Sequence, residues 1–162
     1  MTRALTVRLL EPADIDACEC ILRDLPDWFG IEASNVQYIA DLHTLPTIVA
    51  TVDGEIAGFL TLKRHNPSAS EIHCLAVERA LHRHGIGRAL VTEAERILIA
   101  NGTRLVQVKT LGPSHPDSFY AQTREFYAAM GFLPLDESTA FWGEENPALI
   151  MVKALNKGEL PS

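Results

Sequence analysis

The chain has 162 residues, 47% of them hydrophobic and 22% charged, and its formal net charge is −7. This length fits one domain, no apolar run approaches the roughly 18 residues of a membrane span, and an acidic chain lacks the basic face of a nucleic-acid-binding protein. The three cysteines, Cys18, Cys20 and Cys74, cannot form a paired framework. We therefore expect reduced thiols, a cytoplasmic location, and neither a membrane nor a nucleic-acid partner.

The N-terminal half shows strand and helix patterns in alternation. Apolar residues recur at helical spacing between Ile15 and Leu25, and Ser34 is the expected N-cap of a second helix. Asp53-Gly54 is a strong hairpin signal between two strand-like segments. The segments that the pattern predicts as strands are 6–10, 47–52, 55–63 and 71–77.

From residue 87 the hydrophobic pattern takes a helical period, and Asn101-Gly102 ends this helix. A strand over 104–110 follows, so 71–110 reads as a strand, a helix and a parallel strand. A helix ending at Met130 and strands over 132–135 and 149–153 complete the α/β pattern. We predict a single domain over 1–155, and a frayed tail over 156–162.

The turn after the strand 71–77 carries the clearest chemical signal. It reads His82-Arg83-His84-Gly85-Ile86-Gly87-Arg88. Two glycines allow close approach of the backbone to a ligand, and the free N–H groups at the start of the next helix favour an anion. Arginines at positions 83 and 88 add positive charge. This turn is therefore predicted to bind a phosphate group.

The ligand of this turn is narrowed by what the sequence lacks. A dinucleotide fold needs a third glycine where Leu90 stands, and an acid about 20 residues on, where Leu105 to Val108 stand. A P-loop needs Gly-Lys-Ser or Gly-Lys-Thr, whereas the chain has Gly87-Arg88-Ala89. The turn therefore matches neither a dinucleotide-binding motif nor a P-loop.

The sequence resembles the GCN5-related N-acetyltransferase (GNAT) superfamily in two motifs. The family's pyrophosphate motif, Gln/Arg-x-x-Gly-x-Gly/Ala after an aliphatic-Ala-Val strand end, is matched by Leu75-Ala76-Val77 and His82-x-x-Gly85-x-Gly87. His82 departs from the usual Gln or Arg. The family's Tyr-x-x-x-Gly-Phe is matched from Tyr127 to Phe132. The order of elements agrees from Thr6 to Lys153.

The resemblance implies a mixed sheet with splayed parallel strands, flanked by helices, and acetyl-CoA as acyl donor without a metal. The pantetheine would pair with the backbone of Leu75, Ala76 and Val77, and the pyrophosphate would lie on the turn. The cofactor-binding residues expected there are His82, Arg83, His84, Gly85, Ile86, Gly87 and Arg88. An amine would attack the thioester directly.

The catalytic candidates are Tyr127 and Glu71. The family match favours Tyr127 as general acid, although on the helical wheel it lies beside a stripe that includes Phe126 and is expected to be less committed to the core. Glu71 opens its strand where histone-acetylating members carry a base, and desolvation would raise its pKa. His73 shares the face of Glu71 by the strand period of two and also remains a candidate base.

Trp28 and Phe29, in the loop between the first two helices, are the candidate acceptor-binding residues. The predicted function is transfer of an acetyl group from acetyl-CoA to a primary amine of a small molecule or peptide. A non-catalytic acyl-CoA-binding module and a Rossmann-like nucleotide-binding protein are the alternatives. The sequence leaves the acceptor and the oligomeric state open, a homodimer included.

Overall fold

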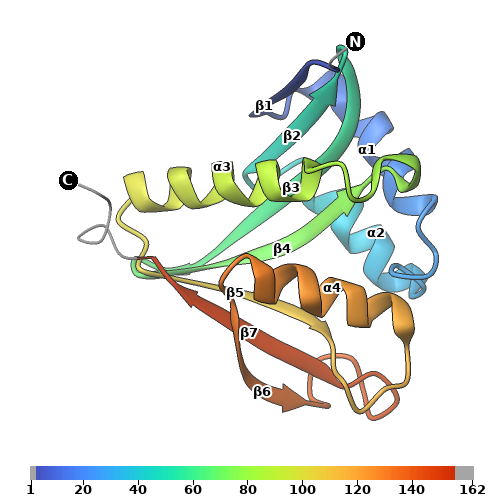
Figure 1. Cartoon of the computed structure of the whole chain (residues 1–162), viewed down its shortest axis with the longest axis vertical. Coiled ribbons are helices and arrows are strands. Elements are labelled where there is room, and N and C mark those ends of the chain that lie inside the picture. The colour runs from blue at the N-terminus through green and yellow to red at the C-terminus, as the bar shows by residue number, and fades with distance from the viewer. Residues whose placement is uncertain (1–2, 156–162) are drawn as a thin grey trace. The chain divides into compact units, whose positions relative to one another are not determined.

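The computed structural model describes residues 3–155, which form two compact units: 3–63 with 73–97, and 64–72 with 98–155. Strands β3 (Glu55–Asn66) and β4 (Ala69–Val77) contribute to both units. In the described part, seven strands form one mixed sheet in the order β1-β2-β3-β4-β5-β7-β6 (Figure 1). The predicted α/β fold class with a mixed sheet is confirmed.

The first unit contains two antiparallel strands before β3, two helices before β2, and most of a long helix after β4. These elements are β1 (Leu5–Leu9), α1 (Ile15–Arg23), α2 (Glu32–Asp41), β2 (Thr47–Val52) and α3 (Ile86–Ala100). Figure 1 shows α3 on the opposite face of the strands from α1 and α2. The α1 side of the sheet holds a core cluster of this unit, which includes Leu22, Val49 and Phe59.

Local backbone conformation in the first unit follows the sequence closely at the hairpin and less closely at α2. Asp53 (φ 52°) and Gly54 (φ 85°) both have positive φ, which is the conformation that a two-residue hairpin turn of type I′ requires. The prediction of Ser34 as N-cap is wrong, because α2 begins at Glu32. The Asn35 N–H already donates to the Ile31 carbonyl at 3.0 Å, so the first helical hydrogen bond forms upstream of Ser34.

The second unit contains three strands and one helix besides the β3–β4 hairpin tip. They are β5 (Leu105–Leu111), α4 (Ser118–Ala129), β6 (Leu133–Ser138) and β7 (Ala148–Ala154). β7 pairs antiparallel with β5 over the whole length of both strands. β4 pairs parallel with β5 only over Ala69–Ile72 and Leu105–Val108, although both strands continue further. Parallel strands that splay apart lose their hydrogen bonds beyond the point of separation, and this short ladder between β4 and β5 has that pattern.

The prediction of one domain over 1–155 stays a prediction, and the predicted frayed tail over 156–162 lies outside the described residues. None of the helices within 3–155 is both long and apolar enough to cross a membrane.

Candidate functional site

The turn between β4 and α3 has the backbone that the sequence predicts for an anion site. Arg83 (φ 66°) and Gly85 (φ 83°) lie in the left-handed region, which is unfavourable for a residue with a Cβ. The Ala89 N–H donates to the Gly85 carbonyl at 3.0 Å, so the helical ladder begins there. The preceding N–H groups of the first turn have no acceptor within the helix. The helix dipole adds partial positive charge at the same place.

His82 does not project freely from this turn. Its Nε2 donates a hydrogen bond to the Val77 carbonyl at 2.7 Å, and its ring packs edge-on against Trp28 with 5.3 Å between centroids. His82 therefore fastens the turn to the last residue of β4. The neighbouring Arg83, His84 and Arg88 are exposed. The structure thus gives His82 a structural contact where the family motif usually has Gln or Arg.

The loop between α1 and α2 is attached to the same turn. The Arg79 guanidinium lies 5.7 Å from the centre of the Trp28 ring, donates to the Asp24 carbonyl at 3.0 Å and pairs with the Asp27 carboxylate at 3.3 Å. Trp28 and Phe29 are half-buried and pack against the core cluster of the first unit. The structure therefore brings the candidate acceptor residue Trp28 next to the candidate CoA-binding turn.

Phe29 is connected to His73 on β4 through the ring of Tyr38 on α2. The Phe29 and Tyr38 rings lie edge to face with 5.9 Å between centroids, and Tyr38 lies edge to face with the His73 ring at 5.2 Å. The His73 Nε2 donates to the Asp41 Oδ2 at 2.7 Å. Tyr38 and Asp41 are three residues apart on α2, which places them on neighbouring positions of one helix face. The sequence analysis did not predict Tyr38 or Asp41 as partners of His73. The signal that was available is their spacing of three residues on one predicted helix.

Leu75, Ala76 and Val77 lie in the last part of β4. Ala76 is buried, whereas Leu75 and Val77 are half-buried, which is the alternation of a strand with one open face. The parallel pairing of β4 ends at Ile72, before this segment begins. The predicted pantetheine-binding backbone belongs to the first unit, as do the turn 82–88 and the loop that carries Trp28 and Phe29.

Glu71 belongs to the second unit and is held by three donors. It is only 3% exposed. The Gln107 Nε2 donates to the Glu71 Oε1 at 2.9 Å, the His65 Nε2 donates to the same oxygen at 2.7 Å, and the Lys109 Nζ pairs with Oε2 at 3.3 Å. Sequence reasoning missed all three partners, because two of them come from β5, more than 30 residues away.

These contacts reverse the expected pKa shift of Glu71. Burial by itself would raise the pKa of this carboxyl, as the sequence analysis expects. The hydrogen bonds from Gln107 and His65 and the charge of Lys109 outweigh burial, so the pKa lies below the ordinary value of 4.5. A carboxylate stabilised in this way is a weaker base.

Tyr127 on α4 is buried, and the predicted order of burial on this helix is wrong. Tyr127 is 4% exposed, whereas Phe126 is half-buried. The Tyr127 ring lies between those of Phe126 (5.1 Å) and Phe132 (5.4 Å), both edge to face. The reason is the helix end: Gly131 has φ 96°, and the Phe132 N–H donates back to the Tyr127 carbonyl at 3.0 Å. This reversal folds Phe132 onto Tyr127.

The comparison with family models supplies the identification. The model described as the acetyltransferase (GNAT) family matches residues 16–132. The chain belongs to the GNAT family. Membership makes the protein an acyltransferase. No curated protein matches the sequence.

Solved structures share this fold over almost the whole chain. A GNAT-family protein from Desulfovibrio desulfuricans is 24% identical with a TM-score of 0.80, and the match covers 94% of this chain and 100% of that one. Ard1 from Thermoplasma volcanium is 21% identical with a TM-score of 0.78, covering 95% and 99%. The protein yncA from Salmonella typhimurium, solved with acetyl-CoA, is 17% identical with a TM-score of 0.71, and the match covers 98% of both chains.

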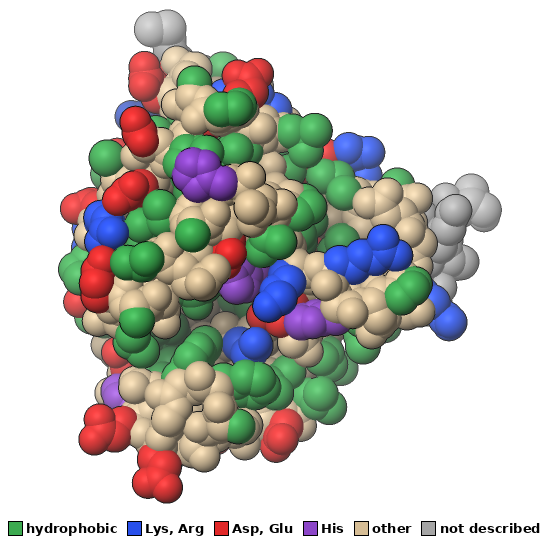
Figure 2. All heavy atoms as spheres, turned by 180° about the vertical axis from the view of Figure 1, so that it is seen from behind, with side chains coloured by type: hydrophobic (Ala, Val, Ile, Leu, Met, Phe, Trp, Pro, Cys, Tyr) green, Lys and Arg blue, Asp and Glu red, His purple; other side chains and the backbone are tan. Residues whose placement is uncertain are grey.

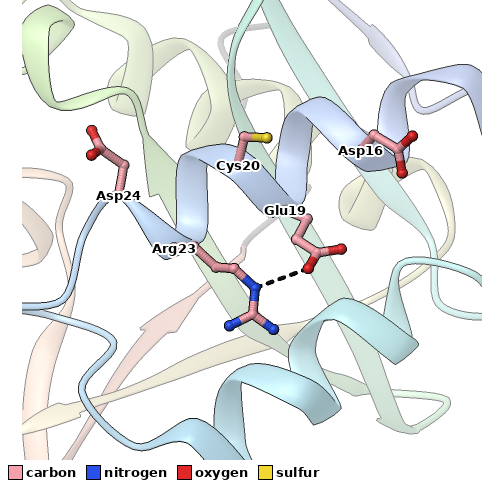
Figure 3. A pocket seen from close by; sticks show the side chains of 5 residues that line it. All are labelled: Asp16, Glu19, Cys20, Arg23 and Asp24. Atoms are coloured by element: carbon pink, nitrogen blue, oxygen red, sulfur yellow. Dashed lines mark hydrogen bonds and ion pairs between the residues drawn. The ribbon is translucent and has the colours of Figure 1, made fainter.

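A separate open hollow lies on α1 of this GNAT chain (Figure 3). Its volume is about 500 Å³. The residues that line it are Asp16, Glu19, Cys20, Arg23 and Asp24. Arg23 is paired with Glu19 at 2.8 Å and with Glu32 at 2.9 Å, and Figure 3 shows Asp16 and Asp24 pointing away from each other. Its carboxylates do not converge, and none of the predicted site residues lines it.

The remaining clusters of polar side chains give no metal-ligand set. Within residues 3–155, no group of three or more His, Cys, Asp or Glu side chains could hold a metal ion. Of the two histidines in the turn before α3, His82 contacts Val77 and Trp28, and His84 is exposed.

Proposed function

We propose that this GNAT protein is an acetyl-CoA-dependent N-acetyltransferase that transfers the acetyl group directly to a primary amine of a small molecule or peptide. The observation that carries the proposal is the turn before α3, in which Arg83 and Gly85 have positive φ and the helical hydrogen-bond ladder begins only with the Ala89 N–H, so the earlier N–H groups have no acceptor within the helix. Backbone N–H groups at a helix N-terminus bind phosphates in many proteins. The acetyl-CoA complex of the Salmonella relative supports the same ligand.

The proposed contacts to the donor come from two adjoining segments of the first unit. Leu75, Ala76 and Val77 would pair with the pantetheine through their backbone, and residues 82–88 would hold the pyrophosphate. Ile86 is only 2% exposed, so it would contribute its N–H and not its side chain. His82 would act by holding the turn in place, while the exposed Arg83 and Arg88 would supply positive charge.

The proposed acceptor is a cation before it reacts, and the surface charge supports this. Acidic side chains gather along the edge that α1 and α2 form (Figure 2). They include Asp16 and Asp24, together with Glu19, Glu32 and Asp27, which are paired with Arg23 or Arg79. An acidic surface raises the local concentration of a cationic ligand. Trp28 and Phe29 remain the proposed acceptor contacts, since their loop adjoins both the turn and His73.

The proposed reaction forms one C–N bond and breaks one C–S bond. The neutral amine attacks the thioester carbonyl, the CoA thiolate leaves, and the sulfur takes a proton, for which Tyr127 remains the proposed acid. The protein would contribute mainly by holding amine and thioester in contact. A cytoplasmic location stays a proposal that is compatible with the free thiols of Cys18, Cys20 and Cys74. The homodimer stays open.

The test is an acceptor screen with acetyl-CoA, followed by release of the CoA thiol. We expect turnover with at least one class among alkylamines, peptide α-amines and aminosugars. A protein whose melting temperature rises with CoA but that acetylates no amine is the binding module. A rise with NAD and none with CoA identifies the Rossmann-like alternative.

Two glycines at opposite ends of α3 offer a matched pair of variants for the donor site. Gly85 (φ 83°) and Gly102 (φ 85°) have the same conformation, and a Cβ at either position would meet nothing within 4 Å. Both Gly85→Ala and Gly102→Ala should cost about 1–2 kcal/mol of stability. We expect only Gly85→Ala to weaken CoA binding, by about tenfold or more, in isothermal titration. Equal CoA affinity in both variants would contradict the proposed site.

A further inference from the structure

The histidine of β4 lies in a fixed arrangement that resembles an acid–base pair. His73 and Asp41 have side chains only 16% and 15% exposed, and their Nε2 and Oδ2 atoms are 2.7 Å apart. We propose that His73 is the general base that takes the proton of the acceptor amine, and that Asp41 is its positioning residue. This inference rests on the proposed N-acetyltransferase function and names the residues that carry its proton transfer.

The hydrogen bonds of Asp41 determine which nitrogen of His73 reacts. A carboxylate can only accept, so Nε2 carries the proton and Nδ1 carries the lone pair. The other carboxylate oxygen, Oδ1, accepts a hydrogen bond from the Gln37 Nε2 at 2.8 Å, one turn earlier on α2. Asp41 is therefore held at both oxygens. A carboxylate in this position orients the imidazole and stabilises the imidazolium that forms when Nδ1 takes a proton.

The place of His73 on β4 suits this role. His73, Leu75 and Val77 alternate with the buried Cys74 and Ala76, so the three share the less buried face of the strand. A strand rises about 3.3 Å per residue, which puts His73 roughly 7 Å from Leu75, where the proposed pantetheine contacts begin. A base at that distance along the strand can reach an amine next to the thioester, directly or through one water.

Among the described residues, the charged group that contacts His73 from the opposing helix is Asp41. From α2, His73 meets Asp41 and the edge of Tyr38. On its own strand the neighbouring Cys74 thiol is neutral, because burial raises its pKa, and burial likewise raises the pKa of the Cys18 thiol to about 12. Glu71, two residues earlier on β4, has its charge matched by Lys109 and its own donors.

The proton balance of the proposed step is complete without a further reactant. The ammonium of the acceptor gives one proton to His73 Nδ1, and the neutral nitrogen attacks the thioester carbonyl. As the C–N bond forms and the C–S bond breaks, the proposed acid Tyr127 gives its proton to the departing sulfur and takes the second proton of the nitrogen in its place. The imidazolium then returns its proton to water. The net products are the amide, CoA as a thiol, and one proton.

The decisive experiment compares His73→Gln and Asp41→Asn with wild type on two acceptors of different basicity. The probes are the side-chain amine of Nα-acetyl-lysine amide, with a pKa near 10.4, and the α-amine of alanyl-alanine amide, with a pKa near 7.7–8.0. For His73→Gln at pH 7 we expect kcat to fall about 10²–10³-fold with the lysine amine. The KM for acetyl-CoA should stay within about threefold. Asp41→Asn should lose about tenfold or more.

The loss should be smaller for the alanyl amine, and for both amines it should shrink as the pH approaches the pKa of the acceptor, because the free amine then arrives neutral. A structural defect would lower both acceptors equally at every pH. Wild-type kcat in His73→Gln, or a loss independent of pH and acceptor, overturns the proposal. If wild type acetylates neither probe, the other amines of the screen are compared in the same way.

If His73→Gln does not fold, the nitrogen-15 spectrum of His73 in wild type decides. We expect the proton on Nε2 in wild type and a change of its tautomer ratio in Asp41→Asn. A proton on Nδ1 in wild type contradicts the pair. Failure of the whole screen, in contrast, removes the proposed function itself, so the two failures are distinguishable.

Discussion

Two histidine–carboxylate pairs share strand β4, and they are built in opposite ways. In the first, His73 with Asp41, the histidine is on the strand and its carboxylate partner comes from a helix. In the second, His65 with Glu71, the carboxylate is on the strand, deeply buried and shared among three donors, while the histidine side chain is 36% exposed. Each N–O distance is 2.7 Å. The two pairs therefore have the same N–O distance but different burial and different numbers of donors on the carboxylate.

The difference lies in how many donors each carboxylate must satisfy. Three donors on Glu71 stabilise its charge and lower its pKa, which suits an anchor between β3, β4 and β5. Asp41 accepts one hydrogen bond at each oxygen, from Gln37 and from His73. The first arrangement fixes a carboxylate, whereas the second fixes an imidazole whose other nitrogen can react. Three substitutions, in order of expected effect, test which side chains take part in the chemistry and which hold the fold.

The largest of these effects concerns whether the second unit takes part in the chemistry. If Tyr127 protonates the departing thiolate, Tyr127→Phe keeps the buried ring and removes only the hydroxyl. We expect kcat to fall about 10²-fold with little change in the KM for acetyl-CoA. Tyr120→Phe, the same change seven residues earlier on α4, is the control and should stay within about twofold. A Tyr127→Phe enzyme with normal kcat but a lower melting temperature would leave Tyr127 a core residue.

The second effect tests Glu71 as an anchor. Glu71→Gln should lose about 2–3 kcal/mol of unfolding free energy at pH 7, because three donors lose the charge of their buried acceptor. The pKa of Glu71 is lowered on folding, so its contribution is complete above about pH 4.5 and disappears as the pH falls through the lower folded value. Urea unfolding between pH 3 and 7 should show the two proteins converging at acid pH.

The control for Glu71 is a half-buried carboxylate with an exposed partner and a pKa shifted in the same direction. Arg96 lowers the pKa of Glu93 on α3, yet the Arg96 side chain is 68% exposed. Glu93→Gln should therefore cost less than about 1 kcal/mol at any pH. If Glu71→Gln keeps wild-type stability but loses kcat/KM at low pH, Glu71 is the base, as the sequence analysis predicted, and the contrast between the pairs fails.

The smallest effect is expected for the exposed histidine. His65→Gln removes the same ring as His73→Gln, from a pair of equal length. We expect less than about 1 kcal/mol of stability lost in thermal unfolding, since the pair is partly solvated, and kcat within about twofold of wild type. A loss of kcat as large as that of His73→Gln would show that the His65–Glu71 pair also takes part in proton transfer, and it would contradict the contrast between the pairs.

Much of the local structure could be predicted from the sequence, because it depends on neighbouring residues. The Asp53-Gly54 hairpin, the glycine after α3 and the turn with Gly85 all have the positive φ that their residues favour. Hydrophobic period alone was less reliable on α4, where it placed Phe126 deeper than Tyr127. The helix ends just beyond Tyr127 and folds Phe132 back onto it, and no periodicity encodes that reversal.

The sequence by itself determined the α/β order of elements, the glycine turn before α3 and the GNAT resemblance, all of which are local patterns of spacing and backbone preference. Only the tertiary structure decided which carboxylate meets which histidine. His73 and Asp41 are 32 positions apart in the chain, and Glu71 and Gln107 are 36 apart. Contacts across such separations arise from the packing of helix on strand and from the register of β4 against β5. The contacts of Glu71 with His65, Gln107 and Lys109 lower its pKa, whereas burial alone would raise it.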